Sequence, residues 1–411
     1  MNGDIDLTCS LNRKYIPPTT EQKLFLKIEI APTETTSKSF PLTVCLLIDK
    51  SGSMAGKKLR NAKEGAIKLV NQLDSNDYCG VVAFEKEVDV VVPGKYVEDT
   101  SFFETKIQKI KWGGLTELYR GLETAFEVLR GQLQQDDTER ETVKRIILLS
   151  DGYPTDNKTE SEYRSLARFM REIGISITAL GIGKDYNENL LSAIAEESGG
   201  MWYHITAPGR IPDVFSSELS NMRTVVFSRP ELVLQLSQGV ELVDICKSRP
   251  DVHRITNVTV EGTTYRVPLM DMRAGERQTI VARIAVPPRP EGEWRIAQVG
   301  VASGGITRRE DVTVQYTPNE SLWKETDPYS RTLFAVTETQ IRVREGLSGD
   351  VTALRQAKTQ LKTLLKDPEA TRINDIADRT LMLEKVLDRT AKVMSEEERK
   401  KVKSDLTRVR R

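Results

Sequence analysis

The chain has 411 residues, which is too long for one ordinary domain and predicts two or three. Its 60 basic residues balance 60 acidic ones, so the net charge gives no reason to expect a nucleic acid as partner. There is no run of 18 apolar residues and no signal-peptide pattern, and the four cysteines are widely spaced without a C-x-x-C pair. We therefore expect a cytoplasmic protein with reduced cysteines, no membrane span, and neither a zinc site nor a disulfide framework.

Two strands are predicted near the start of the chain, from Asp4 to Ser10 and from Gln22 to Ala31. The second alternates apolar and polar residues, which is typical of a strand with one buried and one solvated face. A linker rich in Thr, Ser and Pro, APTETTSKSFP, follows it. The linker indicates that these strands belong to a different sheet from the strand that begins at Leu42.

From Leu42 to about Val226 the sequence alternates between strand and helix patterns. The run from Leu42 to Ile48 is almost wholly apolar, as in a strand buried on both faces. This alternation predicts a Rossmann-like α/β fold: a mostly parallel, doubly wound sheet with helices on both faces. The run from Val88 to Val92 follows Phe84 too closely for a crossover helix, so we expect one antiparallel edge strand there.

After Pro230 short strand-like runs separated by turns predict an antiparallel β-sandwich, into which the strands before Leu42 can pair. The α/β domain would then be inserted in the sandwich, or followed by it. From Tyr329 onwards amphipathic, charged segments predict a helical region, and its basic end LTRVRR is interpreted as solvated. The predicted domains are 1–40 (N-terminal strands), 41–227 (α/β domain), 228–320 (sandwich) and 321–411 (helices).

A polar loop follows the buried strand at Leu42. Asp49, Ser51 and Ser53 alternate along it, and Gly52 allows a tight turn before a helical run from Lys57. Ligands of open α/β sheets bind at such strand ends. A carboxylate and two hydroxyls are hard oxygen donors, which favour Mg²⁺ over Zn²⁺.

Matching donors follow two other elements. Thr116 lies in the glycine-rich loop WGGLTELYRGL, and Asp151 ends the strand in KRIILLSDGYPTD. The order D-x-S-x-S, then Thr in a Gly-Gly loop, then S-D-G resembles the metal-ion-dependent adhesion site of the von Willebrand factor A (VWA) domain. The resemblance covers about 40–226 and rests on five positions: Asp49, Ser51, Ser53, Thr116 and Asp151.

The resemblance implies a metal-binding, non-enzymatic module for protein interaction. Mg²⁺ (or Mn²⁺) would be coordinated directly by Ser51, Ser53 and Thr116, with Asp49 and Asp151 acting nearby, often through water. One position would remain for an Asp or Glu carboxylate of a partner protein. The added sandwich and helices look like the arrangement in inter-alpha-trypsin-inhibitor heavy-chain-like proteins, in Sec23/Sec24-like proteins and in bacterial intracellular A-domain proteins, and no motif in 231–411 distinguishes these classes. Some of the bacterial proteins work beside AAA+ ATPases or in signalling and conflict systems.

Two other functions stay open. In the first, the sandwich and helices bind the partner and the chain is a scaffold or coat-like assembly subunit. In the second, the chain is a metal-dependent phosphoesterase. That reading is weak, because Ser51 stands where the phosphotransferase loop D-x-D has its second Asp. GSMAGKK also lacks the spacing of a P-loop.

Three conspicuous residues near these loops have structural interpretations that we prefer. Trp112 and Tyr153 could touch a partner, but local packing is the more frequent role of such rings. Asp156 is expected to cap a helix N-terminus rather than to bind a metal.

Overall fold

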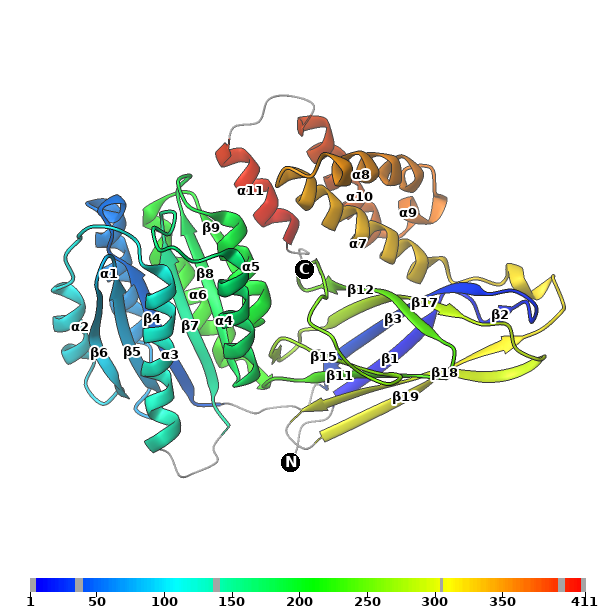
Figure 1. The fold of residues 1–411 in the computed structure, drawn as a ribbon, viewed down its shortest axis with the longest axis horizontal. Helices are drawn as coiled ribbons and strands as arrows, with labels where there is room; N and C mark the ends of the chain where they lie inside the picture. Colours follow the sequence, from blue (N-terminus) through cyan, green and yellow to red (C-terminus); the bar gives the residue numbers. More distant parts are fainter. Residues whose placement is uncertain (1–4, 34–39, 136–140, 304–305, 391–395, 408–411) are drawn as a thin grey trace. The chain divides into compact units, whose positions relative to one another are not determined.

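The structure is a computed structural model that describes residues 5–33, 40–135, 141–303, 306–390 and 396–407 (Figure 1). The chain divides into two compact units. Lys38–Ser228 form one, called here the α/β unit, and Met1–Ser37 with Arg229–Arg411 form the other, the sandwich unit.

The α/β unit contains a six-stranded sheet with the order β6-β5-β4-β7-β8-β9. Its strands are β4 (Leu42–Asp49), β5 (Tyr78–Phe84), β6 (Val88–Tyr96), β7 (Val143–Ser150), β8 (Ile175–Ile182) and β9 (Trp202–Ile205). All neighbouring pairs are parallel except β5 with β6. The predicted parallel sheet and its antiparallel edge strand are therefore confirmed.

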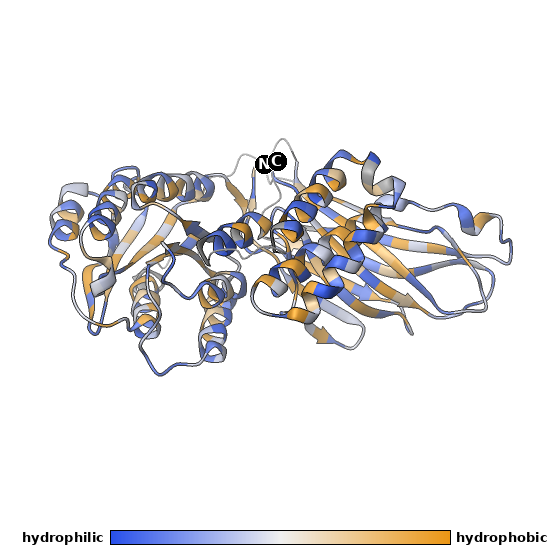
Figure 2. Ribbon diagram, turned by 90° about the horizontal axis from the view of Figure 1, so that it is seen from above, coloured by the Kyte–Doolittle hydropathy of each residue, from blue (hydrophilic) through white to orange (hydrophobic). Residues whose placement is uncertain are grey.

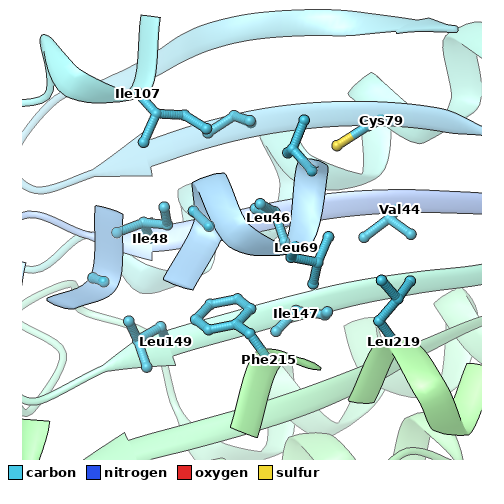
Figure 3. Close-up of a cluster of buried hydrophobic side chains, with 14 of the residues drawn as sticks. Val44, Leu46, Ile48, Leu69, Cys79, Ile107, Ile147, Leu149, Phe215 and Leu219 are labelled. Carbon is cyan, nitrogen blue, oxygen red and sulfur yellow. The ribbon is translucent and has the colours of Figure 1, made fainter. Parts of the chain in front are cut away.

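Helices cover both faces of this sheet, and short 3₁₀ turns precede two of them (Figure 1). They are α1 (Lys57–Val70), α2 (Thr100–Gln108), α3 (Leu118–Gln135), α4 (Glu160–Glu172), α5 (Glu188–Ser198) and α6 (Ile211–Arg223), with η1 (Gly52–Met54) and η2 (Pro208–Arg210). Successive β4 side chains point to opposite faces. Val44, Leu46 and Ile48 pack against α1 and α6, as Figure 3 shows, while Cys45 and Leu47 face α3, α4 and α5.

The strand order places β4 at the centre of the sheet, between β5 and β7. The chain leaves β4 toward β5 and later returns on the other side through β7. The loops after β4 and β7 therefore diverge at a topological switch point, where open α/β sheets form their binding crevice.

The sandwich unit has two larger sheets with the orders β1-β3-β17-β12-β13 and β14-β15-β11-β18-β19-β2. Its strands are β1 (Ile5–Leu11), β2 (Tyr15–Ile16), β3 (Gln22–Pro32), β11 (Glu231–Leu236), β12 (Glu241–Arg249), β13 (His253–Arg254), β14 (Thr259–Glu261), β15 (Thr264–Pro268), β16 (Met272–Arg273), β17 (Gln278–Val286), β18 (Gly292–Ser303) and β19 (Ile306–Tyr316); the short β10 (Val225–Phe227) ends the α/β unit. The N-terminal strand β3 pairs antiparallel with β17. The sandwich therefore combines strands that precede the α/β unit in the sequence with strands that follow it.

Helices pack against the first sheet of this unit. They are α7 (Pro328–Leu347), α8 (Val351–Leu364), α9 (Pro368–Arg372), α10 (Asn374–Thr390) and α11 (Glu396–Thr407), after the turn η3 (Leu322–Lys324). Phe334 of α7 lies 5.1 Å from Phe25 of β3, measured between ring centroids. The buried Arg379 of α10 donates to Ser248 Oγ at 3.0 Å and to Thr337 Oγ1 at 3.1 Å, and so ties two helices to β12.

The helices carry hydrophobic residues along one side and hydrophilic residues along the other (Figure 2). Within the described ranges, none is both long and apolar enough to cross a membrane. Most of the linker APTETTSKSFP (34–39) and the last four residues of LTRVRR (408–411) lie outside the described residues.

Candidate metal centre

Three loops meet at the carboxyl ends of β4 and β7. The first joins β4 to α1, the second precedes α3, and the third follows β7. Gly52 N donates to Gly114 O at 3.1 Å, which joins the first loop to the second. Thr155 N donates to Thr116 O at 2.9 Å, which joins the second to the third. The loops that carry the five predicted site residues are thus bonded to one another.

Asp49 is held through both of its carboxylate oxygens. Its Oδ1 accepts a hydrogen bond from Ser51 N at 2.8 Å, and its Oδ2 accepts one from Ser150 Oγ at 2.7 Å. The residue ends β4, a strand buried along all eight of its residues, and has no exposed surface. Asp49 is therefore a fixed, buried charge.

A row of polar contacts leads from this buried region to the surface. Ser51 Oγ lies 3.0 Å from Ser53 Oγ, and Ser53 Oγ donates to Asp151 Oδ1 at 2.6 Å. Ser51 and Asp151 are buried, whereas Ser53 is exposed. Four of the five predicted residues are thus linked by hydrogen bonds.

Thr116 completes the group by proximity. It is buried, and its backbone N donates to Thr155 Oγ1 at 2.9 Å. A Cβ placed on Gly152 would lie 3.5 Å from Ser53 Oγ and 3.6 Å from Thr116 Oγ1, so both hydroxyls border the same small space. The structure therefore brings all five predicted residues together.

The site carries more negative charge than the protein neutralises. Burial raises the pKa of Asp49 to about 6; hydrogen bonds from Ser51 and Ser150 oppose this rise, and the charge of Asp151 adds to it. Lys58 Nζ forms an ion pair with Asp151 Oδ2. Asp151 thus has an ammonium partner, whereas Asp49 accepts hydrogen bonds from neutral groups, and buried charge is costly until a counterion balances it.

The donor set fits a hard divalent cation. Three hydroxyls and two carboxylates are all oxygen donors, the class that Mg²⁺ and Mn²⁺ prefer and Zn²⁺ does not. Across the described residues, no three His, Cys, Asp or Glu side chains are grouped so that they could hold a metal. A metal here would therefore depend mainly on hydroxyl ligands.

Glu85 holds the second loop, and sequence reasoning missed it. Its carboxylate accepts a hydrogen bond from Gly114 N and lies 3.2 Å from Lys50 Nζ. The bond from Gly114 is the largest cause that lowers the pKa of Glu85. A Cβ on Gly113 would approach this carboxylate to 2.7 Å, so a larger residue there would displace the Glu85 side chain. The available signal was an acidic residue directly after a buried strand, as at Asp49 and Asp151.

Lys58 was missed as well, because a lysine in the first turn of a helix has no distinctive pattern. Asp156 has the predicted capping role, though for a distant helix: its Oδ2 accepts from Tyr119 N, in the first turn of α3, at 3.0 Å. The same oxygen accepts from Tyr163 OH at 2.6 Å. Asp156 therefore fixes the third loop against α3 and α4.

Apolar side chains on two of the loops are exposed. Trp112 and Leu115 flank the Gly113–Gly114 pair with 61% and 52% of their surface exposed, and Tyr153 on the third loop is 54% exposed. More than half of the surface of Trp112 and of Tyr153 therefore faces solvent, and contact of these rings with a partner stays a prediction. Large exposed apolar groups gathered at one site are typical of interaction surfaces.

Comparison with known sequences gives a partial and a nearly full-length match. A human inter-alpha-trypsin inhibitor heavy chain is 30% identical over 172 residues, which are 40% of this chain and 18% of that protein. An uncharacterized protein from Synechocystis is 25% identical over 382 residues, covering 88% of this chain and 87% of that one. This chain thus spans less than a fifth of the heavy chain but most of the Synechocystis protein.

Solved structures share the fold over the whole chain. A von Willebrand factor type A protein from Catenulispora acidiphila superposes with a TM-score of 0.78 at 18% identity, covering 100% of this chain and 98% of that one. The ArnB paralog VWA2 from Sulfolobus acidocaldarius gives a TM-score of 0.64 at 19% identity, covering 98% and 97%. The von Willebrand factor type A domain family matches residues 43–217. With its Rossmann-like sheet, additional antiparallel sheets and C-terminal helices, the chain is a protein that contains a von Willebrand factor type A domain.

Proposed function

We propose that the chain is a non-enzymatic interaction protein whose VWA domain uses a divalent cation, Mg²⁺ or Mn²⁺, to capture an Asp or Glu carboxylate of a partner protein. Ser51, Ser53 and Thr116 would coordinate the ion directly, and Asp49 and Asp151 would lie nearby and contact it through water. The observation that carries the proposal is the hydrogen-bonded row from Ser51 through Ser53 to Asp151. Its middle member, Ser53, is exposed, so a partner can approach the row there.

The protein's own groups have separate tasks in this proposal. Asp49 fixes the Ser51 backbone and supplies buried negative charge. The hydroxyls supply neutral donors, which leave most of the ion's positive charge for an incoming ligand. A bound ion would contribute Lewis acidity toward a carboxylate oxygen.

Partners and cellular setting belong to the same proposal. The inter-alpha-trypsin inhibitor heavy chain and the ArnB paralog are among the relatives and structural neighbours, and VWA domains typically serve protein interactions. Work in the cytoplasm as part of a multi-component system, for example with a AAA+ ATPase, stays a prediction drawn from the resemblance to bacterial intracellular A-domain proteins.

The test is calorimetric titration of Mg²⁺ and Mn²⁺ into EDTA-treated protein, with and without acetate as a minimal carboxylate ligand. We expect the wild type to bind an ion and acetate to tighten that binding. Asp49→Asn should abolish binding, because it removes the buried charge while keeping the side-chain shape.

The matched control is Asp74→Asn, which removes a carboxylate that is 73% exposed and belongs to none of the five positions. It should bind the ion as the wild type does. Equal binding by wild type and Asp49→Asn, or no binding under any condition, would refute the proposal. Mg²⁺-dependent turnover of a phosphoester that requires Asp49 would support the phosphoesterase alternative instead.

A further inference from the structure

A groove is lined by residues of helices α1 and α2 and of the segment that follows α2. The two helices lie side by side on one face of the sheet (Figure 1). Its volume is about 1230 Å³. Small-molecule pockets are usually about 300–1,000 Å³, so this groove is large for a metabolite and suits a segment of polypeptide.

Two residues that line the groove are close in sequence to residues of the candidate metal centre. They are Gly56 and Trp112. Gly56 is three residues after Ser53, and Trp112 directly precedes the Gly113–Gly114 pair. Residues as far along as Asn71 and Gln72, just after α1, also line the groove. From Gly56 to Asn71 a helix rises about 22 Å, the reach of six or seven extended residues.

The lining is basic although the chain as a whole is neutral. Four basic side chains, Arg60, Lys63, Lys68 and Lys111, line the groove against two acidic ones, Glu64 and Glu104. Arg60, Lys68 and Lys111 are exposed. Apolar Leu59, Ile67 and Ile110 provide its floor. A groove with this charge attracts acidic ligands and disfavours basic ones.

We propose that this groove binds an acidic, extended segment of the same partner protein whose carboxylate is captured at the metal centre. The inference rests on the proposed function, because Gly56 and Trp112 of the groove lie close in sequence to Ser53 and Thr116, which are assigned to the ion. It adds the partner's chemistry: a run of Asp or Glu residues beside the captured one, with an apolar residue against Trp112.

The test uses fluorescence anisotropy with a short fluorescein-labelled polyglutamate peptide and the full-length protein in Mg²⁺. The groove variant is Arg60→Gln, Lys68→Gln and Lys111→Gln combined. Lys63 is left intact, because its Nζ donates to Gln108 O at 2.8 Å and so joins α1 to α2. We expect the groove variant to bind the peptide roughly tenfold more weakly, since each exposed charge contributes a modest amount.

The control variant is Arg355→Gln, Lys358→Gln and Lys362→Gln combined. It removes one exposed arginine and two exposed lysines from α8 of the sandwich unit, and it should bind the peptide as the wild type does. A polyglutamine peptide of equal length should not bind. Equal affinity of groove variant and wild type for polyglutamate would overturn the inference.

The two proposals can fail separately. If EDTA or Asp49→Asn leaves peptide binding unchanged while the groove variant weakens it, the groove assignment stands and metal capture fails. If binding requires the metal but not the groove lysines and arginine, metal capture stands and the groove assignment is wrong. A single-stranded oligonucleotide of equal charge that binds the groove more tightly than the peptide would also overturn the choice of partner.

Discussion

Lys58 is the residue whose charge most directly opposes a cation at the candidate centre. Its ammonium group pairs with the buried Asp151, and its side chain is 27% exposed. A divalent ion near Asp151 would be repelled by this ammonium, which must move away or remain as a competitor. We therefore predict that Lys58→Met binds Mg²⁺ about tenfold more tightly in calorimetric titration, a change of about 1.4 kcal/mol.

Lys57→Met is the natural control for this variant. Lys57 is the preceding residue of α1, it is exposed, and its loss changes the net charge by the same amount. Its Mg²⁺ affinity should stay close to that of the wild type. Weaker binding by Lys58→Met would mean that the lysine positions Asp151 for the ion instead of competing with it.

The conformation of the loop before α3 depends on contacts with Glu85, which lies outside that loop. Glu85, at the end of β5, accepts from Gly114 N, and Glu117 N donates to Glu85 O at 2.9 Å. Removing the charge should loosen the segment that carries Thr116. We predict that Glu85→Gln lowers Mg²⁺ affinity severalfold and speeds amide hydrogen exchange in residues 112–117, measured by mass spectrometry.

Glu87→Gln provides the comparison, since Glu87 lies exposed on the same turn between β5 and β6. In that variant, neither the amide hydrogen exchange of residues 112–117 nor the Mg²⁺ affinity should change. If Glu85→Gln exchanged at the wild-type rate, the loop would be fixed by its backbone bonds alone.

At the scale of the whole molecule, the stability of the sandwich unit should depend on pH through a buried ion pair. Lys247 Nζ lies 3.0 Å from Asp251 Oδ1, and both side chains are almost fully buried. Burial alone would raise the pKa of Asp251, but Lys247 and His253 outweigh it and hold that pKa well below its ordinary value. We predict that Asp251→Asn lowers the free energy of unfolding by about 3 kcal/mol at pH 7, because it removes the buried carboxylate that faces the Lys247 ammonium group.

The sign of the pH dependence follows from the lowered pKa. The ionised Asp251 stabilises the fold fully above the ordinary aspartate pKa of about 3.9, and this contribution is lost as the pH falls further toward the folded-state value. Urea unfolding should therefore show a gap between wild type and Asp251→Asn that is constant above pH 5 and narrows below pH 4. Asp311→Asn, which affects a pair about half exposed, should change stability by less than about 1 kcal/mol. A gap that widened on acidification would contradict the assignment.

Local patterns were enough to predict the sheet and to select five positions that the structure brings together. A strand apolar on both faces followed by D-x-S-x-S is complete within a dozen residues, and the S-D-G turn marks its own strand end. Lys58 could not be found in this way, because its ion pair joins residues 93 positions apart in the chain. Glu85 follows a buried strand as Asp49 does, but its role depends on a contact with Gly114, 29 positions away. The exposure of Trp112 and Tyr153 could not be predicted from the sequence either, because it depends on how three separate loops pack.

The pairing of β3 with β17 has a consequence for synthesis of the chain on the ribosome. β3 emerges early, but its partner follows only after about 250 more residues. In that interval β3 has only the hairpin with β1, and an isolated hairpin is marginally stable. The α/β unit can complete its own sheet first, because all six of its strands are made within that interval. Until β17 is made, the edge of β3 that will pair with it is unpaired in the nascent chain. We expect the charged residues Lys23, Lys27 and Glu29, which alternate with buried residues along β3, to prevent aggregation through that edge.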